Sequence, residues 1–404
     1  MTAVLDQAST PGVDVEASAT AATEAAIVRK NRYRTATKVR QLNRFLFPDA
    51  RVGTCGKRRR RTATLQRNNY GRVSWTGIET CGSVWACPIC AAKVRAARGE
   101  EVRYYMEHHL DQGGYVTLIT LTTSHSWSDA LTDVYDDVQK AWAKMTSGRA
   151  WQRFKDKYEI LGPIVATEVT CGVHGWHPHL HVLLFHRKPM GRQGTDTDMA
   201  AELAHRWTYM VDKHTDREAL GRIGCDVMPI SGEAGIAGYL NKIHLEVTRG
   251  DLKQGRYGSR SAWQIGADAA ATGEAQDIAR WAEYVRATRG RKMMRISAEL
   301  VAWYGKPLTA DCSDEALAAL AQDGPAVLHF TGELYDLLLS SRDALGAELP
   351  IAFELGGLPA VLNLLRQRLS RRCAVCAWAW ADVDPHTGVA DERAPLIGLA
   401  LEQL

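Results

Sequence analysis

The sequence predicts an α+β fold in which helices cover one face of an antiparallel sheet. The predicted elements between residues 115 and 246 follow the order β-α-β-β-α-β, which suits such a sheet. A short link with Gly172 and Gly175 separates the two middle strands, which favours an antiparallel hairpin. A chain of 404 residues is too long for one compact domain and fits two or three.

Each element of this core follows from a local pattern. Runs of β-branched and apolar residues predict the strands, and apolar residues at helical spacing, such as Val134, Val138 and Trp142, predict the helices. A further helix from about Cys90 to Leu110 precedes the core. The expected arrangement of the core is ferredoxin-like. Its predicted strands are 115–123, 164–170, 179–185 and 225–230, and its predicted helices are 129–158, 199–213 and 237–246.

Composition divides the chain into four regions. Residues 1–28 are rich in Ala, Thr, Ser and acids and predict a disordered tail. Residues 29–110 form a basic region with several cysteines, residues 111–262 form the core, and residues 263–404 form a mainly helical extension. From residue 267 onward there are 19 acids against 13 Lys or Arg, so this extension is not expected to be a broad surface for nucleic acid.

The most informative strand contains two histidines two residues apart. Side chains of a strand alternate between faces, so His179 and His181 point to one side and Leu180 to the other. Two imidazoles on one face can share a metal ion. The alternative is a core strand with polar residues at its mouth, which is the usual explanation for a single histidine.

A carboxylate is placed to complete this group. Glu168 lies eleven residues before His179, and the predicted hairpin brings its strand alongside. Two imidazoles and one carboxylate leave open positions on a divalent ion such as Mg²⁺ or Mn²⁺. Taken alone, Glu168 would be read as a solvated strand carboxylate.

These residues resemble the metal motif of the HUH endonucleases. The resemblance is closest to the rolling-circle replication initiators of plasmids from actinobacteria and other Gram-positive bacteria. It implies a metal-dependent endonuclease that nicks and joins single-stranded origin DNA, with a host helicase and polymerase as partners. The order of three motifs makes the match specific, and these are Tyr115–Thr123, then Glu168–Thr170 with Gly175–His181, then Gly238–Lys242.

The resemblance assigns the nucleophile to Tyr239, which would attack DNA, form a 5′-phosphotyrosyl link and free a 3′-hydroxyl for a polymerase. A phenol ionises only at about pH 10, so it needs activation and accurate placement. In a helix, Tyr239 and Lys242 share one face, and Lys242 could stabilise the phenolate or the charge on the phosphate. The alternative is a helix tyrosine half buried in the core.

The sequence departs from some relatives just before this tyrosine. Gly235 stands four residues before Tyr239, where those proteins carry a glutamate thought to activate water at termination. Glu233 is the nearest upstream acid, and helical geometry would not put it in the same place. Gly235 and Ile243 also occupy the positions of a second tyrosine in other relatives, so a single-tyrosine site is expected and the termination residue stays open.

The cysteines indicate a second metal site. An odd number of cysteines, nine, in a chain without a secretory signal favours reduced thiols in a cytoplasm. Cys87 and Cys90 form a CxxC pair, Cys81 lies six residues before it, and Cys55 lies 26 residues before Cys81. Four thiolates can hold a structural Zn²⁺, and similar clusters precede the catalytic region of related initiators. The alternative is a set of small buried apolar side chains.

Charge is distributed unevenly along the chain. The formal net charge is only +4, but residues 29–61 contain thirteen Lys or Arg and a single acid, Asp49. The densest block follows Cys55 closely and is expected to contact DNA phosphates, the alternative being a solvated run. This block is Lys57, Arg58, Arg59, Arg60 and Arg61.

Other features set the remaining expectations. No apolar run approaches the roughly 18 residues of a membrane span, and the N-terminus lacks a secretory signal, so a cytoplasmic protein with no membrane partner is expected. Cys373 and Cys376 lack a second pair, and their role stays open. Two rival functions remain, a relaxase or single-tyrosine transposase with the same chemistry, and a non-enzymatic zinc regulator that binds DNA. The origin sequence, the host, the physiological metal and the oligomeric state are open.

Overall fold

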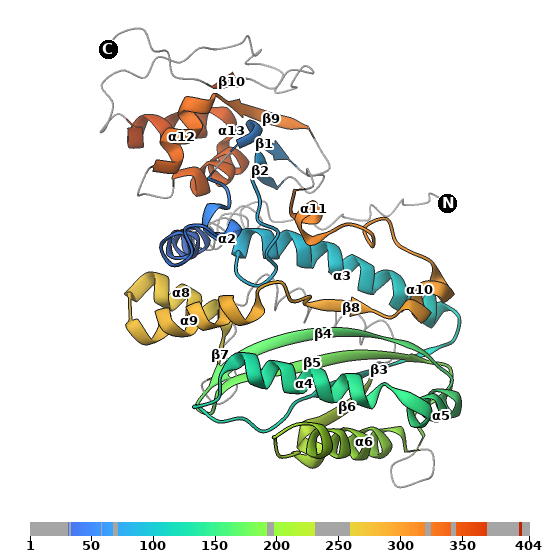
Figure 1. Cartoon of the computed structure of the whole chain (residues 1–404). Coiled ribbons are helices and arrows are strands. Elements are labelled where there is room, and N and C mark those ends of the chain that lie inside the picture. The colour runs from blue at the N-terminus through green and yellow to red at the C-terminus, as the bar shows by residue number, and fades with distance from the viewer. Residues whose placement is uncertain are drawn as a thin grey trace, which may run out of the picture. The chain divides into compact units, whose positions relative to one another are not determined.

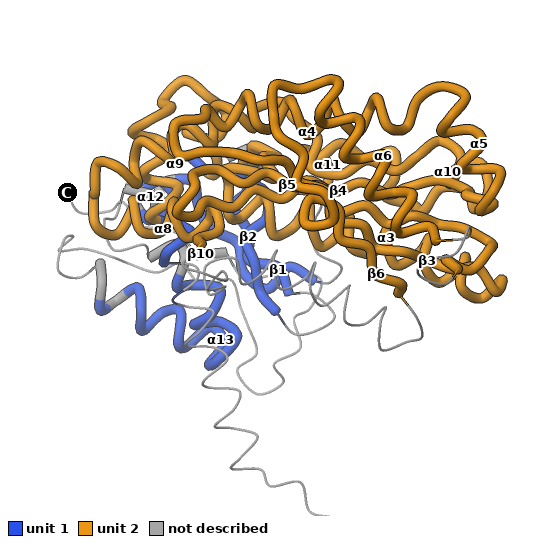
Figure 2. The backbone as a smooth tube through the Cα atoms, turned by 90° about the horizontal axis from the view of Figure 1, so that it is seen from below, with its two compact units in different colours: residues 1–37, 57–78, 321–404 blue, residues 38–56, 79–320 orange. Residues whose placement is uncertain are grey.

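The computed structural model divides into two compact units, which Figure 2 shows in different colours. Unit 1 consists of residues 1–37, 57–78 and 321–404, and unit 2 of residues 38–56 and 79–320. The described residues are 31, 34–57, 59–67, 72–191, 198–230, 259–319, 325–340, 345–369 and 396–397.

Unit 2 is built on a six-stranded sheet in which every described strand pair is antiparallel (Figure 1). The strand order is β6-β3-β5-β4-β7, and β8 also pairs with β4. An α+β class with antiparallel sheets is therefore confirmed. The strands are β3 (Tyr115–Leu121), β4 (Ile160–Gly172), β5 (Gly175–His186), β6 (Cys225–Ile230), β7 (Arg260–Ser261) and β8 (Met294–Ile296).

Helices lie on both faces of this sheet, whereas the sequence predicts them on one. On the first face, α4 (Leu131–Met145), α5 (Gly148–Tyr158) and α6 (Met199–His214) share a core with Leu180, Val182 and Leu184. On the second, α3 (Pro88–Asp111) and α10 (Ala298–Tyr304) share a core with Leu183 and Phe185. The helices on the second face come from segments outside the predicted β-α-β-β-α-β core. The periodicity within that core therefore does not predict them.

A third core in unit 2 lies at the end of the β4–β5 hairpin. It contains Val169 and Trp176 from the hairpin, Trp85 before α3, and Trp281 and Tyr284 from α9. Asn43 is fully buried and joins two of its parts, because Trp281 donates to its side-chain oxygen (2.8 Å) and its amide donates to the carbonyl of Ala86 (2.8 Å). Around this core lie a helix over residues 34–46, α2 (Arg51–Thr54), α8 (Ala262–Thr272), α9 (Ala275–Thr288) and α11 (Asp314–Ala319), and a 3₁₀ turn, η1 (Gly221–Gly224), precedes β6.

Unit 1 contains a second, four-stranded sheet with the order β10-β9-β1-β2. Leu65 of β1 pairs with Leu328 of β9, and both are fully buried in a core that also contains Leu334, Leu349 and Val361. The unit thus joins parts of the regions 29–110 and 263–404, which the sequence predicts as separate domains. Its elements are β1 (Arg59–Arg67), β2 (Val73–Ile78), β9 (Ala326–Phe330), β10 (Leu396–Ile397), α12 (Gly332–Ser340) and α13 (Leu345–Leu369).

One described helix is long and apolar enough to cross a membrane by length and composition alone. It is the stretch Glu348–Leu365 of α13. Gly356 and Gly357 have non-helical backbone angles and interrupt it, and Leu349, Val361 and Leu365 are buried in the core of unit 1. These features favour a kinked core helix.

Several predicted residues lie outside the described ranges. They include Tyr239 and Lys242 with the predicted helix 237–246, the position Gly235, the tail 1–28, Arg58, and the pair Cys373 and Cys376.

Candidate metal centre and active site

The hairpin brings the predicted carboxylate and the two histidines together. Glu168 of β4 lies directly opposite His179 of β5, and Ala166 lies opposite His181. The Oε2 atom of Glu168 is 2.7 Å from Nε2 of His179 and 2.9 Å from Nε2 of His181. The side chains keep some contact with solvent, with exposed fractions of 21% for Glu168, 11% for His179 and 10% for His181. The three residues therefore form one compact, partly accessible group.

The opposite ring nitrogens of the two histidines contact oxygen atoms. Nδ1 of His179 lies 3.2 Å from the carbonyl oxygen of His177, and Nδ1 of His181 lies 3.3 Å from the hydroxyl of Thr120. A carbonyl only accepts, so Nδ1 of His179 carries a hydrogen in this contact, and its Nε2 faces Oε2 of Glu168. Such outer contacts are typical of histidines that bind metals.

The spacing of these ligand atoms fits a divalent cation. An octahedral ion with ligand bonds of 2.0–2.1 Å places neighbouring ligand atoms about 3 Å apart. Burial alone would raise the pKa of Glu168, but the hydrogen bonds and positive charge of His179 and His181 outweigh it and hold that pKa well below its ordinary value. The carboxylate is therefore ionised and can bind a cation. Its two nitrogen neighbours make the set suitable for Mn²⁺ as well as Mg²⁺.

A row of imidazole rings extends from this group. The ring of His177 lies 5.2 Å from that of His179 and stacks on His125 at 4.7 Å. Its Nε2 atom lies 2.6 Å from the hydroxyl of Thr122. Burial, aided by the charges of His179 and His125, lowers the pKa of His177 to about 3, so the ring is neutral at neutral pH.

Sequence reasoning missed the residues that surround the metal group. Thr120 and Thr122 lie on β3 or directly after it, and their neighbours are histidines of β5. The available signal was the period of two, because both threonines alternate with Leu121 along one strand. The contact of His125 with His177 comes from a loop, where no such period applies.

The four predicted cysteines also converge, in a fully buried cluster. Their sulfur atoms all lie within 4.8 Å of one another, with Cys55 at 3.6 Å from both Cys87 and Cys90, and Cys81 at 3.8 Å from Cys90. A tetrahedral Zn²⁺ with Zn–S bonds of about 2.3 Å separates its sulfurs by about 3.8 Å. The cluster could therefore hold a metal, and its geometry is consistent with structural zinc.

Hydrogen bonds within the cluster favour negative charge on Cys55, and its contacts with Cys81 and Cys87 raise the pKa of those two thiols. Hydrogen bonds from Cys81, Cys87 and Cys90 hold the pKa of the Cys55 thiol well below its ordinary value. The backbone N–H of Ser83 donates to the sulfur of Cys81 (3.4 Å). Cys87 occupies the N-cap position of α3, so Cys87 and Cys90 lie at the positive end of the helix dipole.

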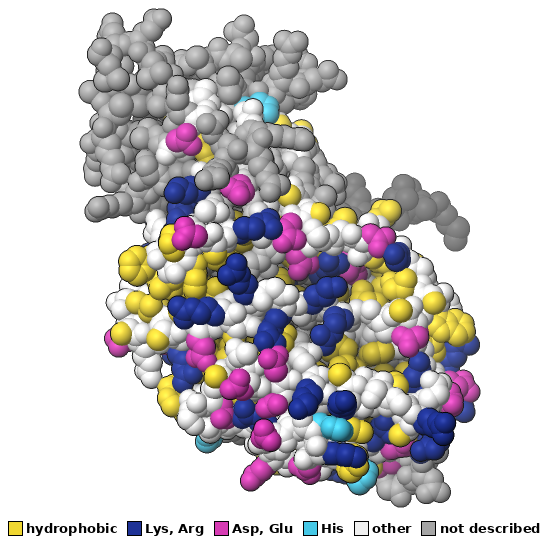
Figure 3. All heavy atoms as spheres, in the orientation of Figure 1, with side chains coloured by type: hydrophobic (Ala, Val, Ile, Leu, Met, Phe, Trp, Pro, Cys, Tyr) yellow, Lys and Arg dark blue, Asp and Glu magenta, His cyan; other side chains and the backbone are white. Residues whose placement is uncertain are grey.

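Four of the five residues in the predicted phosphate-contacting block lie within the described ranges. Lys57 is exposed in a turn before β1, and the backbone of Arg59, Arg60 and Arg61 forms the start of that strand. On the face of unit 2 visible in Figure 3, Lys and Arg side chains are interspersed with Asp and Glu. Charge alone therefore does not mark a path for DNA on this face.

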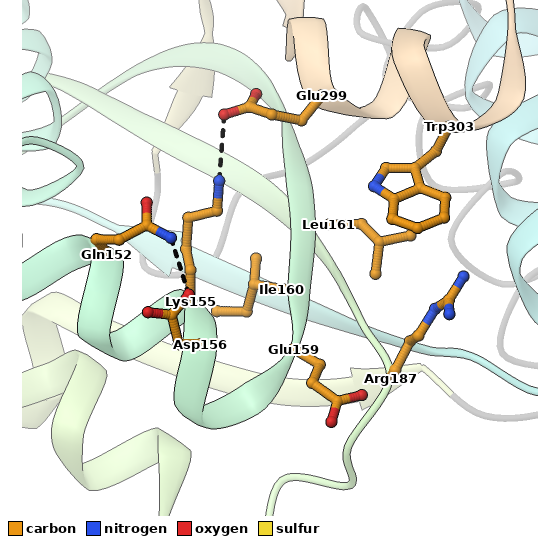
Figure 4. A pocket seen from close by; sticks show the side chains of 9 residues that line it. All are labelled: Gln152, Lys155, Asp156, Glu159, Ile160, Leu161, Arg187, Glu299 and Trp303. Atoms are coloured by element: carbon orange, nitrogen blue, oxygen red, sulfur yellow. Dashed lines mark hydrogen bonds and ion pairs between the residues drawn. The ribbon is translucent and has the colours of Figure 1, made fainter.

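A pocket of about 500 Å³ lies at the other end of β4 and β5. Figure 4 shows Arg187 and Trp303 on one side of it and Lys155 with Glu299 on another. It contains none of the metal-group residues, and its lining mixes two basic and three acidic side chains. The pocket is therefore separate from the candidate metal centre.

Comparison with known proteins finds similarity to replication proteins over part of the chain. Residues 75–217 match the model of a family described as "Replication protein". This part of the chain is therefore similar to replication proteins. The chain is also 28% identical over 315 residues to "Protein rep" of Streptomyces lividans, which covers 61% of this chain and 69% of that protein. The family-level resemblance to plasmid Rep proteins is thereby confirmed.

A second relative shares a shorter region. The chain is 33% identical over 143 residues to a protein of Streptomyces cyanogenus named "Neomycin resistance protein", and this region is 29% of the chain and 33% of that relative. No solved structure matches the chain significantly. The replication protein match contains Glu168 and both metal-group histidines, whereas Cys55, Tyr239 and Lys242 lie outside it.

Proposed function

We propose that the chain initiates rolling-circle replication of a plasmid by nicking and rejoining single-stranded DNA at the origin. The observation that carries this proposal is the convergence of Glu168, His179 and His181 on one point of the sheet. The group lies within the region that matches the replication protein family. "Protein rep" of Streptomyces lividans, which aligns over most of its length, adds support.

The strand order also supports an HUH-type core. In chain order, β3, β4, β5 and β6 occupy sheet positions 2, 4, 3 and 1 along the path β6-β3-β5-β4. Helices α4 and α5 connect β3 to β4, and α6 precedes β6. This order agrees with the connectivity expected of a ferredoxin-like unit and supports the proposal. We therefore interpret residues 115–230 as such a core.

The chemistry divides between the metal group and the tyrosine. A bound Mg²⁺ or Mn²⁺, held by Glu168, His179 and His181, would polarise and orient the scissile phosphate. The Tyr239 hydroxyl loses its proton and its oxygen bonds to phosphorus, forming a 5′-phosphotyrosyl ester. The bond from phosphorus to the 3′ oxygen breaks, and that oxygen takes up a proton to leave as a hydroxyl. Lys242 stabilises the negative charge that develops, and attack by a 3′-hydroxyl on the ester rejoins the strand.

The remaining parts of the chain take supporting roles in this proposal. Zinc bound by Cys55, Cys81, Cys87 and Cys90 stabilises the hydrophobic core at the end of the β4–β5 hairpin. The basic block from Lys57 to Arg61 contacts the backbone of origin DNA, and a host helicase and polymerase act after the nick. These steps take place in the cytoplasm.

Covalent trapping tests the proposal. The protein is incubated with a single-stranded oligonucleotide from the origin of its own replicon and Mn²⁺, and a denaturation-resistant adduct is mapped by mass spectrometry. We expect the modified peptide to contain Tyr239. Tyr239→Phe should abolish the adduct, whereas Tyr209→Phe, which alters an exposed tyrosine on α6, should leave it unchanged. Chelation of divalent ions should prevent its formation.

The same experiment separates the rival functions. A non-enzymatic zinc regulator would bind the oligonucleotide without forming an adduct in any variant, and this outcome would refute the proposal. A relaxase or transposase would form the same adduct, so plasmid maintenance is measured as well. Under the proposal, Tyr239→Phe abolishes replication of the plasmid in cells.

A further inference from the structure

An exposed tryptophan lies in the loop that follows β3. Trp127 is 47% exposed, and the guanidinium of Arg280 lies 4.1 Å from its ring centre. Arg280 also donates to the carbonyl of Trp127 (3.3 Å) and forms an ion pair with Glu283 (3.2 Å). The ring is therefore held by a cation while about half of the residue remains accessible to solvent.

The loop is braced against the turn of the metal hairpin. Gly175 has a φ of +89°, and an added Cβ would lie 2.8 Å from the carbonyl oxygen of Ser126 and 2.9 Å from Cα of Trp127. The carboxylate of Asp129 accepts from the backbone N–H of Ser126 (2.7 Å) and pairs with Arg217 (2.6 Å). The close approach of Gly175 and the hydrogen bonds of Asp129 hold the loop in place, so Trp127 has a defined position relative to the hairpin.

That position places Trp127 along the hairpin from the candidate metal centre. Gly175 pairs with Gly172, four residues along the strand from the Glu168–His179 pair. At about 3.3 Å per residue this is a distance of roughly 13 Å along the strand. Between them lies the row of rings formed by His179, His177 and His125. The spacing corresponds to a few nucleotides of a DNA strand.

We propose that Trp127 and His125 form a stacking platform for bases of single-stranded DNA beside the scissile phosphate. Single-stranded nucleic acid is bound by aromatic side chains on which bases stack, at about 1–3 kcal/mol per base. Asp129 and Arg217 are paired with one another, as are Arg280 and Glu283, so the loop offers rings rather than unpaired positive charge. The ligand is thus recognised through its bases more than through its phosphates.

The chain contains a matched control for this platform. Trp303 is 56% exposed and lies under the guanidinium of Arg187, 4.7 Å from its ring centre, in the pocket of Figure 4. It has the same partner type and similar exposure, but it lies beside the start of β4, at the end of the strand remote from Glu168. A general effect of removing an exposed tryptophan should be equal at both positions.

Binding to two probes tests the inference. Fluorescence anisotropy is measured with a labelled thymidine homopolymer and with an abasic strand of equal length, which keeps the phosphates and lacks the bases. We expect wild-type protein to prefer the homopolymer. Trp127→Ala should weaken homopolymer binding about tenfold or more and leave abasic binding unchanged, while Trp127→Phe retains most of the affinity. His125→Ala should have a smaller effect of the same kind, and Trp303→Ala should match the wild type.

The outcomes are distinguishable from those for the proposed function, on which the choice of DNA as ligand rests. Equal homopolymer affinities for Trp127→Ala and Trp303→Ala would overturn the platform, as would an equal loss on both probes or the absence of any wild-type preference for bases. Thermal unfolding of each variant shows whether the fold is retained, and Trp127→Phe tests stacking if Trp127→Ala unfolds. A missing covalent adduct would instead contradict the role of Tyr239 and leave the binding comparison valid.

Discussion

The two candidate metal groups of unit 2 differ in how completely protein surrounds them. The cysteine group consists of four residues that are each at most 6% exposed and lie in a hydrophobic core. Among the residues that the structure describes, the group of Glu168, His179 and His181 has three ligand residues, and each keeps a tenth to a fifth of its side chain accessible. Four sulfurs complete a tetrahedral ion, whereas three ligands leave positions for a substrate.

The comparison shows that the hydrophobic core around the cysteine group also includes residues next to the Glu168 group. The cysteines share their core with Val169, which directly follows Glu168 on β4, and with Trp176 at the start of β5. Glu283 of α9 fixes this end of the hairpin, because it accepts from Trp176 (2.7 Å) and from the backbone of Leu131 (2.9 Å). We expect loss of the cysteine group to disturb both sites, and loss of the Glu168 group to disturb only one.

The largest effect is expected from Cys87→Ser. Cys87 is fully buried at the N-cap position of α3, and the binding energy of a structural zinc is part of the folding energy. We expect loss of the bound zinc and a decrease of at least about 3 kcal/mol in the free energy of unfolding. Zinc content by elemental mass spectrometry and thermal unfolding by circular dichroism measure both changes.

Cys312→Ser is the matched control for the cysteine group. Cys312 is a free, partly buried cysteine that packs against the same core without belonging to the cluster. The Cys312→Ser variant should retain a full equivalent of bound zinc. A Cys87→Ser protein with unchanged zinc content would show that the cluster is merely a set of buried thiols.

Glu168→Gln should separate metal binding from folding. The amide lacks the charge that attracts a cation, so we expect Mn²⁺ affinity and nicking to fall more than about 100-fold. The free energy of unfolding should change by no more than about 2 kcal/mol, since two hydrogen bonds to a partly exposed group are altered. Isothermal titration with Mn²⁺, a nicking assay and thermal unfolding give the three values.

Glu202→Gln provides the control for this carboxylate. Glu202 lies on α6, pairs with Lys157 (2.8 Å) and has an exposed fraction of 32%. Its replacement should leave Mn²⁺ affinity and nicking unchanged. If Glu168→Gln unfolded the protein as severely as Cys87→Ser, the contrast between a structural and an open site would be wrong.

The smallest effect concerns His186 at the far end of β5, which belongs to neither candidate metal group of the described residues. His186 accepts from the hydroxyl of Thr117 (2.8 Å) and donates through Nδ1 to the carbonyl of Lys188 (2.6 Å). Burial lowers its pKa from 6.5 to about 4, so between these values the unfolded chain binds more protons than the folded one. Its contribution to stability is present above about pH 6.5 and is lost as the pH falls toward 4. We expect a loss of about 2 kcal/mol between pH 7 and pH 5.

Denaturant unfolding of the wild type and of His186→Gln at these two pH values checks this expectation. The variant removes the titrating group and can still accept from Thr117, so its stability should fall less between pH 7 and pH 5. An equal fall in both proteins would assign the pH dependence to other groups. The measurement is made without divalent ions, so that proton competition at His179 and His181 for a metal does not contribute.

Short-range patterns in the sequence determined the candidate site. The period of two predicts that His179 and His181 share a face, and the short glycine-containing link predicts that Glu168 lies beside them. The CxxC pair with Cys81 similarly predicts a sulfur cluster, because a helix start brings Cys87 and Cys90 together. In each case the residues are adjacent or joined by one turn, so local geometry fixes their distance.

Only the tertiary structure decided which distant segments complete these groups. The pairing of β1 with β9 joins residues more than 250 positions apart, and the sequence of neither strand indicates which strand it pairs with. The contacts of Thr120 with His181 and of Gly175 with Trp127 likewise depend on strand register and loop path. Secondary structure follows from periodicity along the chain, whereas partners across the fold are selected by the shape and burial of whole surfaces, which a linear pattern does not encode.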